Sequence, residues 1–124
     1  LLDKFGCERV ILNALHGSIS LFNEDLSAAL VSAVNDWVAK HWLDRDPRLR
    51  ASILLPMHTP ANAVREIERL AHDKRFVQVL VPVSGDLPLG KRIHWPIFEA
   101  ALAAVAVRFG GTRLIDNVIL DPHN

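Results

Sequence analysis

The sequence lacks several features that would identify a class of protein at once. Cys7 is its only cysteine, so neither a disulfide nor a cysteine-based zinc site can form within the chain, and we expect a buried, inert thiol. The 14 basic and 14 acidic side chains cancel, which leaves no net field to attract nucleic acid or an anionic membrane. No apolar run approaches the roughly 20 residues that cross a bilayer, and no leader opens the chain, so we expect a cytoplasmic protein.

The local motifs of common enzyme classes are missing as well. No serine, cysteine or lysine stands in the sequence context of an activated nucleophile, and Gly85 and Gly90 lack the spacing of a phosphate-binding loop. The chain contains no His-x-His pair. No enzyme class is therefore indicated by a local motif alone.

Half of the 124 residues are hydrophobic, which is enough to bury the core of a single domain spanning residues 1–124. The first residue is Leu1 rather than methionine, and residues 1–5 followed by Gly6 are typical of the last turn of a helix. We therefore expect that further residues precede Leu1 and that the chain is a truncated portion of a longer protein.

Short aliphatic runs bounded by glycine, proline or charged residues predict strands that are buried on both faces. Three such runs are 9–15, 51–55 and 76–81, and residues 113–120 are a candidate for a last strand. Buried strands of this kind are typical of parallel sheets.

Helices are predicted between these strands. Asn23 is a typical N-cap and opens a long helix, Thr59-Pro60 opens a second, and Trp95-Pro96 opens a third that Gly110-Gly111 would end. The charged segment Asp44 to Arg50, with its proline, predicts a solvated turn after the first helix. The long helix carries residues at spacings of three and four that predict one broad buried face: Leu26, Ala29, Leu30, Ala33, Val34, Trp37, Val38, His41 and Trp42.

This alternation predicts an α/β fold, with partial (β/α)-barrel-like βαβ units around a parallel sheet of three to four strands. A complete eight-stranded barrel needs about 250 residues, so the chain supplies about half of one. Half a barrel leaves two open sheet edges. The chain would then flatten into a small three-layer sheet, pair with a copy of itself, or belong to a longer protein.

Several phrases of the sequence resemble one family. They are Val34-Asn35-Asp36-Trp37 in the long helix, the run from Trp42 to Arg50, and Arg75-Phe76-Val77-Gln78-Val79-Leu80. From Arg9 to about Ala104, these phrases and the order of elements resemble the amidohydrolase-related family of metal-dependent barrel hydrolases and decarboxylases, which includes the aminocarboxymuconate semialdehyde decarboxylases. The resemblance covers roughly three quarters of the chain and implies a (β/α) barrel that acts on a small-molecule substrate.

The resemblance also implies a divalent metal, usually zinc, in complete members. Their ligands are a His-x-His pair on the first strand, a histidine on a central strand and a late aspartate, and zinc requires about three such ligands. The His-x-His pair would precede Leu1. The central histidine corresponds to Arg108, which has no lone pair to offer, if residues 105–108 form a strand; the alternative keeps them in the third helix. We therefore expect no metal ligands and no cofactor in this chain itself.

Beyond Gly111 the family likeness ends. Residues 112–117 resemble instead a phrase near the end of pantothenate synthetases, so we interpret 112–124 as a divergent tail. Asp116 lies on the candidate last strand, but too few strands precede it for the family's late aspartate.

Three polar residues follow predicted strands directly, at the sheet edge where barrel enzymes place their chemistry: His16, His58 and Asp86. They are the catalytic candidates, although a histidine in a loop is more often a surface or capping group. His41 and His72 are interpreted as structural, His94 as a residue at a helix start, and His123 as part of the tail. Core packing is the preferred interpretation for Trp37, Trp42 and Trp95.

Two functions are compatible with these observations. In the first, the chain is a fragment or degenerate member of the metal-dependent family without independent catalysis, and a small molecule is its partner only within a complete barrel. In the second, it is a non-catalytic α/β module that self-associates as a homo-oligomer or docks to a partner through its sheet edges and apolar helix faces. Neither function involves nucleic acid or a membrane.

Overall fold

The computed structural model describes residues 2–15, 21–81 and 88–108, with only the backbone for 105–108. Three strands, β1 (Val10–Leu12), β2 (Leu49–Leu54) and β3 (Phe76–Leu80), form a parallel sheet in the order β1-β2-β3. All three strands predicted in this part of the chain are confirmed. The candidate strand at 113–120 lies outside the described residues.

Two strand boundaries differ from the prediction. β1 is shorter than the run 9–15, and β2 begins at Leu49 rather than at Ala51, so Leu49 and Arg50 belong to the sheet and not to the charged turn. The amide of Val10 donates to the carbonyl of Arg48, and Val10 pairs with Leu49, which extends the ladder to these residues. Partner strands far along the chain therefore decide where β2 begins.

The helices are α1 (Glu24–Val38), α2 (Pro60–Leu70) and α3 (Trp95–Arg108). A π-helical segment, η2 (Ala39–Leu43), continues α1, and a short 3-10 turn, η3 (Arg92–His94), leads into α3. The side chain of Asn23 accepts from the amide of Leu26 at 2.9 Å, which confirms the predicted cap of α1. Pro60 opens α2 as predicted, but the Thr59 hydroxyl donates to the Glu24 carboxylate instead of capping the helix.

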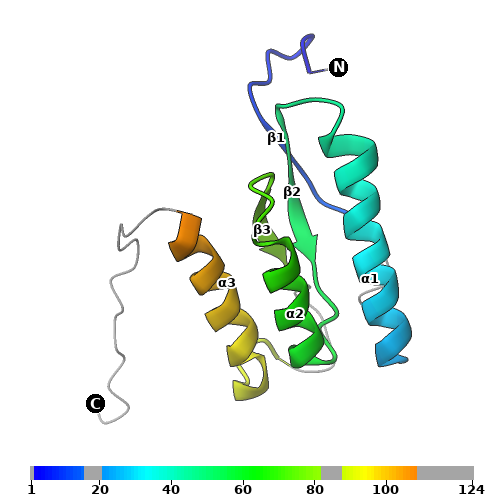
Figure 1. The fold of residues 1–124 in the computed structure, drawn as a ribbon, viewed down its shortest axis with the longest axis vertical. Coiled ribbons are helices and arrows are strands. Elements are labelled where there is room, and N and C mark those ends of the chain that lie inside the picture. Colours follow the sequence, from blue (N-terminus) through cyan, green and yellow to red (C-terminus); the bar gives the residue numbers. More distant parts are fainter. Residues whose placement is uncertain (1, 16–20, 82–87, 109–124) are drawn as a thin grey trace.

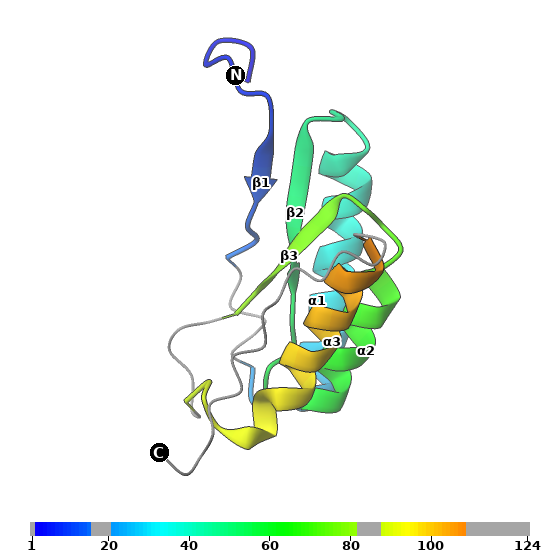
Figure 2. The same cartoon turned by 90° about the vertical axis from the view of Figure 1, so that its left-hand side faces the viewer.

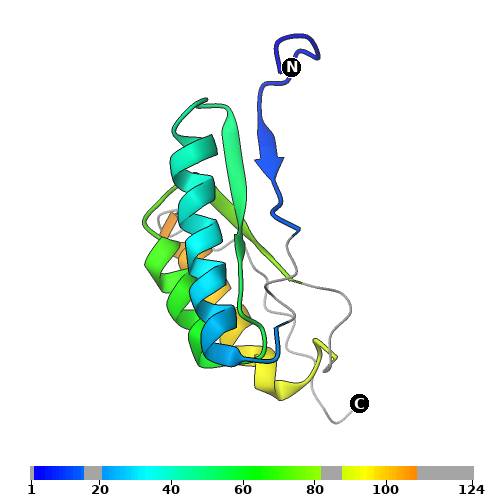
Figure 3. The ribbon, with the colours of Figure 1, turned by 90° about the vertical axis from the view of Figure 1, so that its right-hand side faces the viewer.

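All three helices pack on one face of the sheet (Figures 2 and 3). No described element covers the other face, so the described part has two layers and does not flatten into the three-layer sheet considered above. The helices lie in the order of the strands, with α2 between α1 and α3 (Figure 1). This is the arrangement of part of a (β/α) barrel, with its helices outside and its interior face open.

The core lies between the sheet and the helix layer. Its buried members include Phe76 and Ile53 from the strands, and Ile67 and Ile97 from the helices. Among the described residues, no helix is long and apolar enough to cross a membrane.

The predicted buried face of α1 was wrong in part. The buried residues of α1 are Ser27, Val31, Asn35 and Val38, while the side chains of Leu26 and Trp37 are 50% and 52% exposed. Two of the four buried residues are polar, and hydropathy alone assigns such residues to the surface. Of the apolar residues that the periodicity selected, Val38 is buried and Val34 packs against the core, as predicted. Leu26, Leu30 and Trp37 are exposed instead.

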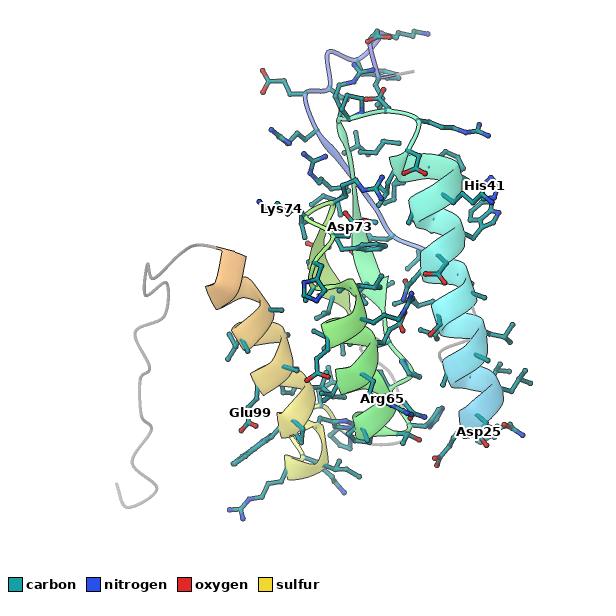
Figure 4. All side chains as sticks on the ribbon, in the orientation of Figure 1. Asp25, His41, Arg65, Asp73, Lys74 and Glu99 are labelled. Carbon is teal, nitrogen blue, oxygen red and sulfur yellow. The ribbon has the colours of Figure 1, made fainter. Side chains whose placement is uncertain are left out.

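The prediction that the three tryptophans pack in the core was also wrong. Each of Trp37, Trp42 and Trp95 is about half exposed. Trp37 contacts the rings of Trp42 and His41, with centroids 6.2 and 5.5 Å apart, and His41 points away from α2 (Figure 4). Trp95 lies under the guanidinium of Arg92, 5.4 Å from its centroid. These aromatic side chains pack on the surface with near neighbours in sequence.

Candidate functional site

The carboxyl ends of the strands meet the amino ends of the helices at one edge of the molecule. β2 runs toward the end at which α1, α2 and α3 begin (Figure 1). In (β/α) barrels this edge carries the chemistry, because loops after the strands surround the barrel interior there. The segments at this edge that the structure describes are the ends of the β1–α1 and β3–α3 loops and the whole β2–α2 loop.

His58 lies in the β2–α2 loop and is half-buried. Its Nε2 atom is buried and forms no hydrogen bond within the described structure. The imidazole stacks against the ring of Phe22, whose centroid is 6.4 Å away, at an interplanar angle of 30°. Because Phe22 precedes α1 and Thr59 also bonds to Glu24, the loops after β1 and β2 are held together here. The prediction that His58 lies at this edge is confirmed, and its catalytic role stays a prediction.

His94 is a second histidine near this edge, and sequence reasoning did not select it as functional. It ends η3, its side chain is 5% exposed, and neither ring nitrogen finds a hydrogen-bond partner among the described residues. Its backbone amide donates to the carbonyl of Lys91 at 3.0 Å. A buried imidazole without partners is uncommon, since buried polar groups are normally hydrogen-bonded. The apolar neighbours Ile93 and Trp95 in the sequence were a weak signal of its burial.

Three polar residues, Ser52 on β2, Gln78 on β3 and Asn13 directly after β1, form a row across the open face of the sheet. The Ser52 hydroxyl donates to Oδ1 of Asn13 at 2.6 Å, and Nε2 of Gln78 donates to the Ser52 hydroxyl at 2.8 Å. The strand neighbours of Asn13 and Ser52 pack in or against the core, which directs these two side chains away from the helices; these neighbours are Leu12, Ala14, Ala51 and Ile53. A β-bulge at Val77 brings Gln78 opposite Ser52.

Sequence reasoning missed this row. Its signal was a polar residue at an alternate position within each apolar run, but the alignment of the three residues depends on the sheet register and on the bulge. The amide groups of Asn13 and Gln78 are exposed, so each retains hydrogen-bonding capacity toward the space that the open face borders.

A buried polar cluster lies behind β2 and holds its carboxyl end. The Asn35 amide donates to the carbonyl of Leu54 and accepts from its backbone amide, both at 3.0 Å. Asn35 Nδ2 also donates to the Glu66 carboxylate at 2.7 Å, which accepts from Ser32 and Arg69 as well. Asn35 therefore ties α1 and α2 to the residue at which β2 ends, four residues before His58.

Burial raises the pKa of the Glu66 carboxyl, but hydrogen bonds from Arg69, Asn35 and Ser32 outweigh that effect and hold the pKa below its usual value. Arg69 also pairs with Asp36 at 2.7 Å. Two of the four residues in the phrase Val34-Asn35-Asp36-Trp37 thus make structural contacts.

The described residues do not fit a zinc ion. Zinc in proteins requires about three side-chain ligands, and no group of three or more histidine, cysteine or acidic side chains in the described part is placed to hold a metal. His16 and Asp86 lie outside the described residues. Residues 105–108 belong to α3, so the strand that would place Arg108 at a ligand position is not formed, and the helical alternative is correct.

Comparison with known proteins identifies a family. The amidohydrolase family model matches residues 3–104, nearly the range over which the sequence resembles the family. No match was found among curated proteins.

Two solved structures share this fold. One is 5-carboxyvanillate decarboxylase from Sphingomonas paucimobilis, with a TM-score of 0.73 and 25% identity over 83% of this chain and 31% of that protein. The other is 2,6-dihydroxybenzoate decarboxylase from Rhizobium, with a TM-score of 0.71 and 22% identity over 83% of this chain and 34% of that protein. The chain thus spans about a third of the length of either structure. It belongs to the amidohydrolase family and forms a partial (β/α) barrel of that family.

Proposed function

We propose that this chain is a section of a metal-dependent barrel enzyme that acts on a carboxylated aromatic substrate, and that it contributes part of the substrate-binding wall without holding the metal. The observation that carries the proposal is the match to 5-carboxyvanillate decarboxylase, at a TM-score of 0.73 and 25% identity over 31% of its length. The second similar structure is also that of a decarboxylase of an aromatic acid. A cytoplasmic location stays a prediction.

The side chains of this section suit binding and orientation. On the open face of the sheet, the Asn13 amide offers N–H donors and the Gln78 amide offers a carbonyl acceptor, so a carboxylate or a phenol could be held by the row that Ser52 fixes. His58 Nε2, with no partner in the described structure, can donate to or accept from a substrate oxygen at the strand ends. A bound metal would supply Lewis acidity and would orient the carboxylate.

The first experiment asks whether the 124-residue chain acts alone. The purified chain is mixed with Zn²⁺ or Mn²⁺ and with 2,6-dihydroxybenzoate or 5-carboxyvanillate, and CO₂ release and bound metal after dialysis are measured. We expect CO₂ release at the rate of the protein-free control and no stoichiometric metal. Turnover, or one retained metal per chain, would contradict the proposal.

The second experiment extends the chain. The coding sequence upstream of Leu1 is read and expressed in frame with the chain, and metal content and decarboxylation are measured again. We expect the extension to carry a strand with a His-x-His pair and to bind metal. An upstream sequence that contains no such strand, or an extended chain that binds no metal, would count against the barrel-section proposal.

Self-association is the second candidate function, favoured by the exposed apolar stripe on α1 and η2. The stripe comprises Leu26, Leu30, Trp37 and Trp42, which are 40–52% exposed, and it is continued by Phe22 at 88%. Exposed clusters of this size and aromatic content are typical of interfaces. Sedimentation velocity over a hundredfold concentration range tests this candidate, with Trp37→Ser as the disruptive variant and Trp95→Ser as the control. A monomer at every concentration would exclude it.

A further inference from the structure

The exposed apolar stripe on α1 and η2 has small residues at its centre. Ala33 is exposed, three residues after Leu30 and four before Trp37, so it lies between them on the same side of the helix. Ala29, one turn earlier, is exposed as well. Because the side chains at a contact set the distance between packed helix axes, alanines at the centre of a stripe allow a second helix to approach closely.

The π-helical segment η2 widens one end of the stripe. The amide of Asp44 donates to the carbonyl of Ala39, five residues earlier, at 3.1 Å. Side chains five residues apart face each other in such a turn, and the rings of Trp37 and Trp42 are in edge contact with centroids 6.2 Å apart. Departures of this kind from α-helical geometry are frequent at functional sites. The local helix geometry therefore gathers two tryptophans on the surface.

The area of the stripe suits a symmetric pair of chains. An aromatic side chain carries about 150–250 Å² of surface. Trp37 and Trp42 are about half exposed, and Phe22 is largely exposed. With Leu26 and Leu30, each copy therefore offers on the order of 500 Å² of apolar surface. Two such faces bury about 1,000 Å², which is the lower limit for a specific interface and predicts micromolar rather than nanomolar association.

The two ends of the stripe carry opposite charges. Glu24 and Asp25 lie in the first turn of α1. Lys40 and His41 lie in the last turn of η2. Figure 4 shows Asp25 and His41 at opposite ends of this helix. Asp25 and Lys40 form no ion pair within the described part of the chain, so both are available to a partner.

We propose that two copies of this chain associate through α1 and η2, with the two helices antiparallel and the symmetry axis near Ala33. The acidic start of each helix then meets the basic end of its partner, and the helix dipoles attract each other, whereas a parallel pair would place like charges side by side. Leu30 of each copy lies opposite Trp37 of the other, as a two-fold axis requires. The proposal rests on the second candidate function, self-association, and adds the orientation and the contacts of the pair.

Sedimentation velocity of the unaltered 124-residue chain comes first. We expect a dimer with a micromolar dissociation constant, and a monomer in the Trp37→Ser variant. A monomer at every concentration would overturn both this proposal and the self-association on which it rests. A dimer that persists in Trp37→Ser would overturn this proposal and leave self-association through another surface.

Disulfide cross-linking tests the orientation. In a Cys7→Ser background, Ala33→Cys is expected to form a covalent dimer in oxidised glutathione, because the two thiols face each other across the axis. Leu26 lies seven residues earlier, so the two Leu26 positions of an antiparallel pair are about 20 Å apart, beyond the reach of a disulfide. Leu26→Cys is therefore the matched control and should stay non-covalent. Equal cross-linking of both variants, as in a parallel pair, or a dimer in which Ala33→Cys does not cross-link, would overturn the proposal.

Charge exchange tests the pairing of the two ends. Asp25→Lys and Lys40→Glu are each expected to raise the dissociation constant of the dimer roughly fivefold, because symmetry breaks two pairs at once. The double variant should return to within about twofold of the unaltered chain. Both changes oppose the dipole of α1, so effects on the helix alone would add rather than cancel. Lys74→Glu, in the exposed turn before β3, is the control. A double variant as weak as the single variants would contradict the antiparallel pair.

Discussion

The two ends of the strands differ. At the amino ends, called here the amino edge, the turns that lead into β2 and β3 are each closed by an aspartate and an arginine two residues later. At the carboxyl ends, the carboxyl edge, the described loops carry histidine ring nitrogens without hydrogen-bond partners in the described structure. Asp46 and Arg48 precede β2, and Asp73 and Arg75 precede β3. In each turn the aspartate accepts from the backbone amide of the arginine at 2.9 Å and from its guanidinium. Asp73 and Lys74 are visible at the start of β3 in Figure 4.

Each of these arginines also reaches a second carboxylate. Arg48 pairs with Asp3 at 2.7 Å, and Arg75 pairs with Asp44 at 2.5 Å, so each guanidinium links its own turn to a neighbouring segment. At the opposite edge, the buried Nε2 of His58 and both ring nitrogens of His94 have no partner in the described structure. The ion pairs therefore stabilise the amino edge. The carboxyl edge retains hydrogen-bonding groups that a ligand can use, as in complete barrels.

The largest effect is expected at Asn35, which holds the carboxyl end of β2. Asn35→Ala would leave the buried amide and carbonyl of Leu54 and one oxygen of Glu66 without their partners, and we expect the free energy of unfolding to fall by about 3 kcal/mol. Urea denaturation followed by tryptophan fluorescence measures this change. Hydrogen exchange should show the amides at the carboxyl end of β2 losing more protection than those at its amino end.

Asn62→Ala is the matched control for Asn35→Ala. Asn62 lies in α2, and the one hydrogen bond described for its side chain is accepted from the exposed side chain of Arg65. We therefore expect the free energy of unfolding to change by less than about 0.5 kcal/mol. If Asn35→Ala were equally mild, β2 would not be held from behind by this side chain. The buried cluster around Asn35 would then not stabilise the carboxyl edge.

A smaller effect, of opposite sign, is expected at His94. Leucine has a similar volume and no polar atoms, so His94→Leu removes two buried nitrogens that lack partners, and we expect the chain to become more stable by about 1 kcal/mol. His72→Leu, at an exposed position after α2, is the control and should change little. Denaturant midpoints provide the measurement. Marked destabilisation by His94→Leu would mean that the imidazole forms hydrogen bonds within the chain and is not free to bind a ligand.

The contrast between the edges also shows what the sequence could and could not predict. The existence of the three described strands and the helix starts at Asn23 and Pro60 were predicted correctly, because they depend on neighbours within a few residues. The family was also predicted correctly, from phrases spread along the chain. His58 was placed at the correct edge by the same reasoning. The edge itself follows from the order of strand and helix, which any parallel crossover imposes.

The remaining features depend on partners that are distant in sequence. The buried face of α1 includes Asn35, whose partners Leu54 and Glu66 are 19 and 31 residues away, so apolar periodicity could not identify it. The row of Asn13, Ser52 and Gln78 exists only in the register that the bulge at Val77 creates. The burial of His94 depends on how η3 packs against the rest of the chain. The local sequence carries at most a weak signal of these features, because each depends on partners that are distant along the chain.

The smallest expected effect is a pH dependence that originates at the amino edge. Hydrogen bonds from the side chain and the backbone of Arg48 lower the pKa of Asp46 from 3.8 to about 2. A carboxyl with a lowered pKa in the folded state stabilises the fold above its unfolded pKa, and that contribution disappears as the pH falls from about 4 through 2. Asp46→Asn keeps the turn but removes this titration, so its stability deficit relative to the wild type should be constant above pH 5 and should shrink toward pH 2.

Urea midpoints of the two proteins, measured between pH 2 and pH 6, test this prediction. Arg45→Gln changes a charge in the same turn while leaving Asp46 and Arg48 paired, so its profile should run parallel to that of the wild type. Should the deficit of Asp46→Asn stay constant down to pH 2, Asp46 would not be held ionised by Arg48. The amino edge would then resemble an ordinary solvated turn, and the difference between the two edges would rest on the unpartnered imidazoles alone.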